Sequence, residues 1–154
     1  MLVFTGTHIN KIDRKGRVSV PAPFRAALAE TGAGGFAIFP SFNLKTLEAC
    51  GSDVMAALAD DTLGNYSFFT SDHNNLATRI FEVTHQLAWD AEGRVGLPDE
   101  LIAHAGIGEV AVFVGKGRFF QVWAADAFAA QRAATDAKIA QDPPRLVLRR
   151  PEGS

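Results

Sequence analysis

The sequence is poor in the features that membrane anchors, disulfide scaffolds and thiolate metal sites require. Cysteine occurs once in 154 residues, at Cys50, which excludes an internal disulfide and a multi-cysteine zinc site. We expect Cys50 to be a buried, small apolar residue. The longest apolar runs, such as 110–114, are far shorter than the roughly 20 residues that a transmembrane helix needs. We therefore expect no contact with a membrane.

Groupings typical of enzymes are missing as well. The four histidines have no metal-ligand spacing, and neither a nucleophile elbow nor a phosphate-binding loop is present. We therefore predict a protein that is not an enzyme, with no metal, cofactor or small-molecule substrate. Residues 1–6 lack the basic and long apolar regions of a signal peptide, so a cytoplasmic location is expected.

An excess of one charge is also lacking. Fifteen Lys and Arg residues stand against 17 Asp and Glu residues, which gives a formal charge of −2. Binding to nucleic acid would therefore need a local basic patch. Apolar residues make up 47% of the chain, enough for the core of one compact domain or two small halves.

What the sequence does contain is a repeat. Residues 13–21 (DRKGRVSVP) recur 77 positions later as residues 90–98 (DAEGRVGLP). Downstream, residues 36–39 match residues 110–113 at an offset of 74, so the second copy is shorter by three residues in the intervening loop. Two copies with matches in the same order indicate a duplication and favour a pseudo-twofold architecture.

Each copy predicts the same order of elements. Strand, tight turn, short strand, short helix, apolar strand, further strand and longer helix are expected in turn. In the first copy the six strands and helices are expected at 7–12, 17–20, 23–29, 36–39, 43–47 and 47–58. In the second copy they are expected at 84–89, 94–97, 98–105, 110–114, 119–123 and 125–140. The tight turns are Asp13–Gly16 and Asp90–Gly93, because Asp favours the first and Gly the fourth position of a type I turn.

These elements imply a strand-rich α+β fold built from two halves. We place the halves at 7–52 and 83–126, a linking helix at 72–82 and a flexible tail at 142–154.

The two turns differ in charge. Residues 11–17 hold four cations, Lys11, Arg14, Lys15 and Arg17, against the single acid Asp13. The corresponding residues 88–94 hold one cation and two acids. Lys and Arg at the tip of a rigid hairpin suit contacts with phosphates and with the edges of bases. Alternatively, the first turn is an ordinary exposed turn in which Asp13 and Arg17 form a local ion pair.

The duplicated pattern D-x-x-G-R-V-x-[VL]-P resembles the MraZ family of bacterial transcriptional regulators, which are built from two SpoVT-AbrB-type halves. The resemblance runs from about Phe4 to Ala129. It is carried by Phe4, Gly6, residues 15–21, Phe24, Arg25, Arg79 and the second turn with Asp90, Gly93 and Arg94. It implies an interlocked, pseudo-twofold barrel of swapped β-hairpins with flanking helices.

The resemblance also implies a function. Members of this family form rings, often octamers, that present basic hairpins to double-stranded DNA. They bind short direct repeats upstream of the division and cell-wall gene cluster, which includes the regulator's own gene. The D-x-x-x-R element of the family falls on Asp13 and Arg17, and again on Asp90 and Arg94. Together with the charge of the first turn, the resemblance predicts DNA contacts by Lys11, Arg14, Lys15 and Arg17. A structural role in the two turns is predicted for Asp13, Gly16, Asp90, Gly93 and Arg94.

Three functional classes remain open on the sequence. The first is a sequence-specific, nucleoid-associated regulator of transcription that acts on DNA as a ring of identical chains. The second is an AbrB-like module whose hairpins contact a protein, such as an antitoxin-type partner. The third, a small enzyme on a related barrel, is disfavoured because acids, histidines and cysteines do not cluster.

Overall fold

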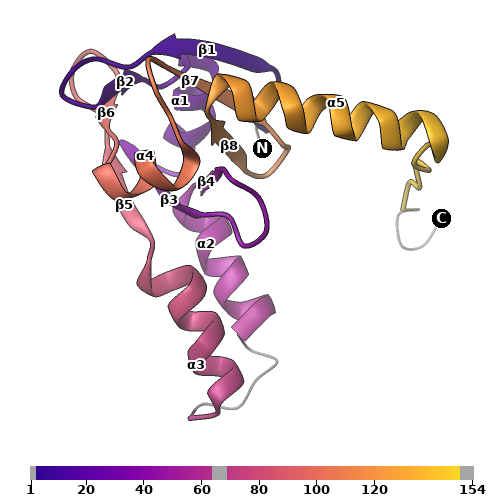
Figure 1. Cartoon of the computed structure of the whole chain (residues 1–154). Coiled ribbons are helices and arrows are strands. Elements are labelled where there is room, and N and C mark those ends of the chain that lie inside the picture. Colours follow the sequence, from indigo (N-terminus) through magenta and orange to yellow (C-terminus); the bar gives the residue numbers. More distant parts are fainter. Residues whose placement is uncertain (1–2, 64–68, 150–154) are drawn as a thin grey trace.

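The computed structural model describes residues 3–63 and 69–149, and it confirms a strand-rich α+β fold (Figure 1). The strands are β1 (Thr7–Lys11), β2 (Arg17–Ser19), β3 (Gly35–Pro40), β4 (Leu47–Cys50), β5 (His85–Ala88), β6 (Arg94–Gly96), β7 (Val110–Gly115) and β8 (Phe120–Trp123). The α-helices are α1 (Ala22–Ala29), α2 (Ser52–Leu58), α3 (Ser71–Ala77), α4 (Asp99–Ala105) and α5 (Ala125–Gln141). A π-helical turn follows α2 at Ala59–Leu63, and another follows α3 at Thr78–Glu82.

The two copies exchange strands. An antiparallel sheet of six strands has the order β1-β7-β8-β4-β3-β5, so β1 of the first copy pairs with β7 of the second. In the same way, β5 of the second copy pairs with β3 of the first. The edge strands β1 and β5 each turn sharply into β2 and β6, which pair with one another as a separate two-stranded ribbon. This ribbon therefore connects the two edges of the larger sheet.

The pairing corrects the alignment of the two copies. His8 lies opposite Phe113, and its repeat equivalent His85 lies opposite Ile38. Ile38 and Phe113 are therefore equivalent, at an offset of 75 and not 74, and both are fully buried in the main core. The sequence match was wrong by one position because both strands are apolar at nearly every residue. A shift of one residue turns each side chain to the other face of a sheet, and only the neighbouring strands fix the choice.

Each copy contributes to one core. Its centre is a group of contacting phenylalanines with ring centroids 4.9 to 6.4 Å apart, which are Phe4, Phe24, Phe36, Phe113 and Phe120. Val18 and Val95, opposite one another in the ribbon, are each 1% exposed and close the core on that side. Because Phe24 of α1 and Leu101 of α4 are equally buried, the two short helices pack alike.

One segment differs from the expectation. The strand predicted at 43–47 and the helix predicted at 47–58 are wrong at their junction, since β4 occupies Leu47–Cys50 and the helix begins at Ser52. Residues 47–50 lie between β3 and β8, where they pair with strands on both sides. Leu47, Ala49 and Cys50 are buried, as expected for the single cysteine. Their strand conformation thus depends on distant partners that local sequence does not reveal.

The remaining helices extend away from the sheet. Figure 1 shows α2 and α3 leading away on one side and α5 projecting on another, towards the C-terminus. The α2 end is held by a small apolar cluster that includes Met55 and Ile80. Residues 142–149 follow α5 without regular structure, and residues 150–154 of the predicted tail lie outside the described residues. Within the described parts, none of the helices is long and apolar enough to cross a membrane.

Candidate nucleic-acid interface

The first turn is organised by the carboxylate of Asp13. Its Oδ1 accepts hydrogen bonds from the backbone N–H groups of Lys15 and Arg17, both at 2.9 Å. Its Oδ2 accepts from Nε of Arg17 at 2.7 Å. The Gly16 N–H donates to the Asp13 carbonyl at 3.0 Å, and Gly16 has φ of +78°, a conformation that favours glycine. Backbone and side chain of Arg17 are thus both fixed by one residue.

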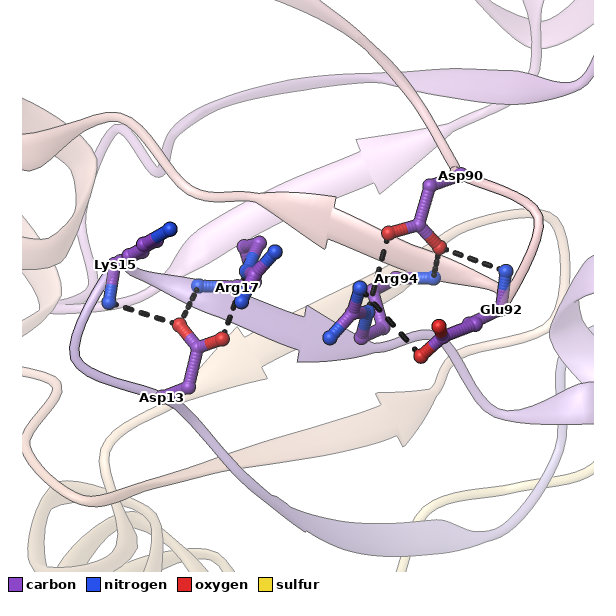
Figure 2. A network of polar contacts seen from close by, with 6 residues as sticks. All are labelled: Asp13, Lys15, Arg17, Asp90, Glu92 and Arg94. Carbon is purple, nitrogen blue, oxygen red and sulfur yellow. Dashed lines mark hydrogen bonds and ion pairs between the residues drawn. The ribbon is translucent and has the colours of Figure 1, made fainter.

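The second turn repeats this arrangement. Asp90 Oδ1 accepts from the N–H groups of Glu92 and Arg94 at 2.9 and 3.0 Å, and its Oδ2 accepts from Arg94 Nε at 3.1 Å. Gly93 has the same φ of +78°. Figure 2 shows the two turns at opposite ends of the β2–β6 ribbon, each with its own Asp–Arg pair. The pairing that the sequence left as an alternative for Asp13 and Arg17 is therefore present in both copies.

The ribbon joins the turns through reciprocal backbone bonds. The Leu97 N–H donates to the carbonyl of Gly16, and the Val20 N–H donates to the carbonyl of Gly93, both at 2.9 Å. Each turn is therefore anchored to the strand that leaves the other turn. This mutual anchoring holds the two tips on a rigid support, and a binding site needs such a support to keep its side chains in place.

The hydrogen bonds also set the protonation of the two acids. The pKa values of Asp13 and Asp90 lie below the ordinary range of aspartate, chiefly because the backbone N–H of Arg17 or Arg94 donates to the carboxylate. The guanidinium groups lower both pKa values further. Both turns are therefore held by an ionised carboxylate at neutral pH.

The two tips differ in their free charges. Lys11, Arg14 and Lys15 are exposed, and their side chains have no acidic partner within residues 3–63 and 69–149. At the second tip the equivalents of Arg14 and Lys15 are Ala91 and Glu92, and Glu92 lies 3.5 Å from Arg94. The structure thus brings the four cations predicted for DNA contact together around the first turn. Three of them are unpaired there, while Arg17 is bound to Asp13 through Nε.

Comparison with known proteins identifies the family of the chain. Residues 80–150 match the family model described as "MraZ protein, putative antitoxin-like". Over 126 residues the chain is 41% identical to the "Transcriptional regulator MraZ" of Pelagibacter ubique, which covers 82% of this chain and 81% of the relative. The protein of the same name from Rickettsia canadensis is 43% identical over 125 residues, or 80% of this chain and 82% of the relative. The chain belongs to the MraZ family.

A third relative extends the match. The "Transcriptional regulator MraZ" of Gluconacetobacter diazotrophicus is 38% identical over 141 residues, covering 90% of this chain and 87% of the relative. The predicted family resemblance is therefore confirmed. Membership of the MraZ family, whose proteins bear the name of a regulator, also confirms that the chain is not an enzyme. Among the described residues, no group of His, Cys, Asp and Glu side chains could hold a metal ion.

One residue at the turns was named for the family resemblance but was given no role at the turns from the sequence. Arg25 of α1 lies over the second turn, so that a Cβ on Gly93 would meet its guanidinium Cζ at 2.7 Å. In the other copy, Ile102 of α4 lies over Gly16, with its Cδ1 3.6 Å from the corresponding position. Arg25 and Ile102 are repeat equivalents, 77 positions apart. The signal that could have drawn attention to Arg25 is this exchange of a cation for an apolar residue between matching helices.

Proposed function

We propose that this MraZ-family chain is a sequence-specific DNA-binding regulator of transcription whose first hairpin contacts DNA. The observation that carries the proposal is the exposed basic tip, Arg14 and Lys15 with Lys11 beside them, on a turn that Asp13 holds rigid. Unpaired cations on a fixed support bind phosphates without first breaking an ion pair. The name of the curated relatives, a transcriptional regulator, supports the same conclusion.

Arg17 has a different role in this proposal. Its Nε is used by Asp13, whereas its two terminal nitrogens have no acceptor among the described residues. A guanidinium aimed by one carboxylate can still offer a planar pair of donors to another group. We assign Arg17 to a base edge, because paired donors from Arg match the O6 and N7 acceptors of guanine. Arg14, Lys15 and Lys11 then hold the hairpin on the backbone.

The finer features implied by the family resemblance belong to the same proposal. Strands exchanged between the copies, together with a ribbon linking both sheet edges, support a swapped-hairpin barrel of the SpoVT-AbrB type with halves at 7–52 and 83–126. We further propose that identical chains form a ring, an octamer, which acts on the nucleoid. Its DNA is a set of short direct repeats in its own promoter region, upstream of the division and cell-wall gene cluster.

A charge reversal at the first tip tests the proposal. Arg14→Glu with Lys15→Glu should abolish binding to the DNA upstream of the protein's own gene, because the tip would then repel phosphates. The matched control is Lys138→Glu with Arg145→Glu, an equal change in charge at exposed positions of α5 and the tail. Binding is measured by fluorescence anisotropy, and the thermal melt should be unchanged in both variants, as is usual for exposed sites. If the tip variant binds with wild-type affinity, the first hairpin is not the DNA contact.

The ring is tested separately. One short basic hairpin per chain gives few contacts, and several hairpins on one closed assembly raise the effective concentration at tandem sites. Static light scattering at micromolar concentration should therefore give the mass of a closed oligomer. A monomer mass under these conditions would contradict the ring while leaving DNA contact by the hairpin to be judged by the anisotropy experiment.

A protein partner is the second candidate function. The family description includes the words "antitoxin-like", which favours an AbrB-like module whose hairpins contact a protein. Salt separates the two functions, because DNA binding weakens with a slope of about −0.9 in log–log terms for each phosphate contacted. A steep slope with the upstream DNA supports the regulator. Failure to bind this DNA at low salt would favour the protein partner.

A further inference from the structure

We propose that Arg25, on helix α1, is a phosphate-binding residue of the second hairpin, so that this hairpin also contacts the DNA backbone. The inference rests on the proposed DNA-binding function and deepens it. It assigns the second hairpin a cation that its own sequence lacks, since Ala91 and Glu92 replace Arg14 and Lys15 there. The cation comes from the first copy and reaches the second turn through the packing of α1.

The guanidinium of Arg25 is held in one position. A Cβ on Gly93 would lie 2.7 Å from its Cζ, 2.8 Å from its Nε and 2.9 Å from its Nη1, so the group lies directly against the turn glycine. Its Nε donates to the carbonyl of Val20 at 3.1 Å. Because the Val20 N–H donates in turn to Gly93, one short network fixes strand, turn and guanidinium together.

The remaining donors of Arg25 are available. Its two terminal nitrogens have no acceptor among the described residues, and the side chain is only partly buried. Arg94, the cation within the second turn, is bound to Asp90 and lies near Glu92. Arg25 is therefore the cation without an acidic partner beside this tip. A planar fork with free N–H groups matches the oxygens of a phosphate.

The other copy shows that the turn itself does not need this charge. Ile102 occupies the equivalent place over Gly16, and the first turn keeps the same hydrogen bonds and the same φ as the second. An apolar side chain thus suffices to cover the glycine. The guanidinium of Arg25 adds a positive charge and two terminal nitrogens that no hydrogen bond among the described residues uses, next to a tip that is otherwise acidic. An anionic ligand is the group that would use them.

The experiment exploits this natural equivalence. Arg25→Ile gives the second turn the cover that the first turn already has, and Arg25→Lys keeps the charge without the planar fork. Binding to the upstream DNA is measured by anisotropy at several salt concentrations, alongside the thermal melt and the mass by light scattering. We expect Arg25→Ile to bind several-fold more weakly, with the log–log salt slope reduced by about one for each second hairpin engaged. Arg25→Lys should keep the wild-type slope.

Several outcomes would overturn the inference. If Arg25→Ile binds DNA with wild-type affinity and slope, Arg25 only covers the turn. The same conclusion follows if Ile and Lys variants lose binding equally and both melt earlier. Should Arg25→Ile fail to fold, Arg25→Gln, which keeps a donor for the Val20 carbonyl, replaces it with the same expected loss of slope. If the wild type itself does not bind the DNA, the proposed function fails and the inference fails with it. If only the Arg14 and Lys15 variant loses binding, the proposed function stands and the inference about Arg25 is wrong.

Discussion

At the scale of single residues, each copy contains an aspartate with the same structural role. Asp13 and Asp90 each accept two backbone N–H groups and one guanidinium Nε, and each thereby fixes the arginine four positions later. The arrangement lowers the pKa of both carboxyl groups, with the backbone N–H of the arginine as the largest cause. Protonation of these two carboxyl groups at low pH should therefore destabilise the folded state.

Substitution of Asp90 tests this pH dependence. A carboxyl group whose pKa is lower in the folded state stabilises that state above its unfolded pKa, which is about 4, and loses this contribution as the pH falls through the folded pKa. We therefore expect Asp90→Asn to be less stable than the wild type by a constant amount from pH 5 to 7. Below pH 4 the difference should shrink towards that of two uncharged side chains. Urea denaturation at a series of pH values measures this, and a difference that stays constant down to pH 2 would show that the charge of Asp90 is irrelevant.

At the scale of elements, the sequence predicted what is local and missed what depends on distant neighbours. The turns at Asp13 and Asp90 and the short helices after Pro21 and Pro98 follow from residues within one turn of each other, and all are present. Strand β4 was predicted too early, at 43–47, because Leu47–Cys50 becomes a strand only between β3 and β8.

The same distinction between local and distant signals applies to the candidate site. The basic tip was visible from charge alone, whereas the position of Arg25 over Gly93 requires knowing that α1 packs on the other copy's turn. Likewise, the one-residue error in aligning β3 with β7 arose because apolar side chains fill both faces of these strands. Their register is decided by β1 and β5, which come from the opposite copies.

Strand β3 offers a matched pair of substitutions at its start. Gly35 is buried, and a Cβ there would collide with the backbone carbonyl oxygen of Leu87 in β5, whereas a Cβ on Gly34 meets nothing within 4 Å. Gly35→Ala should therefore destabilise the fold by about 1–3 kcal/mol, because β5 must move away from β3. Gly34→Ala should stay within about 0.5 kcal/mol of the wild type. Chemical denaturation measures the free energy of unfolding of both variants. Equal values would mean that β5 can shift without cost.

At the scale of the whole molecule, neither copy is complete by itself. Strand β1 has its sheet partner β7 in the second copy, strand β5 has β3 in the first, and β2 pairs with β6 across the two. The phenylalanine cluster also draws on both, with Phe24 of the first copy against Phe120 of the second. Duplication has thus produced one interdependent unit, in which each copy supplies the edges of the other.

This interdependence predicts how fragments behave. A fragment of residues 1–63 lacks the partners of β1 and β2 and one of the two partners of β3 and of β4. A fragment of residues 69–154 lacks the partners of β5 and β6 and one of the two partners of β7 and of β8. We expect each fragment alone to be largely unfolded at low micromolar concentration. Any structure it gains at higher concentration should come from pairing with a second copy of itself, because repeat equivalents can replace one another. The two fragments mixed in equal amounts should regain the strand signal in circular dichroism and melt cooperatively, at a temperature that rises with concentration. A single fragment that melts cooperatively as a monomer, at a temperature independent of concentration, would show that one copy is a folding unit and that the exchange of strands is not needed for stability.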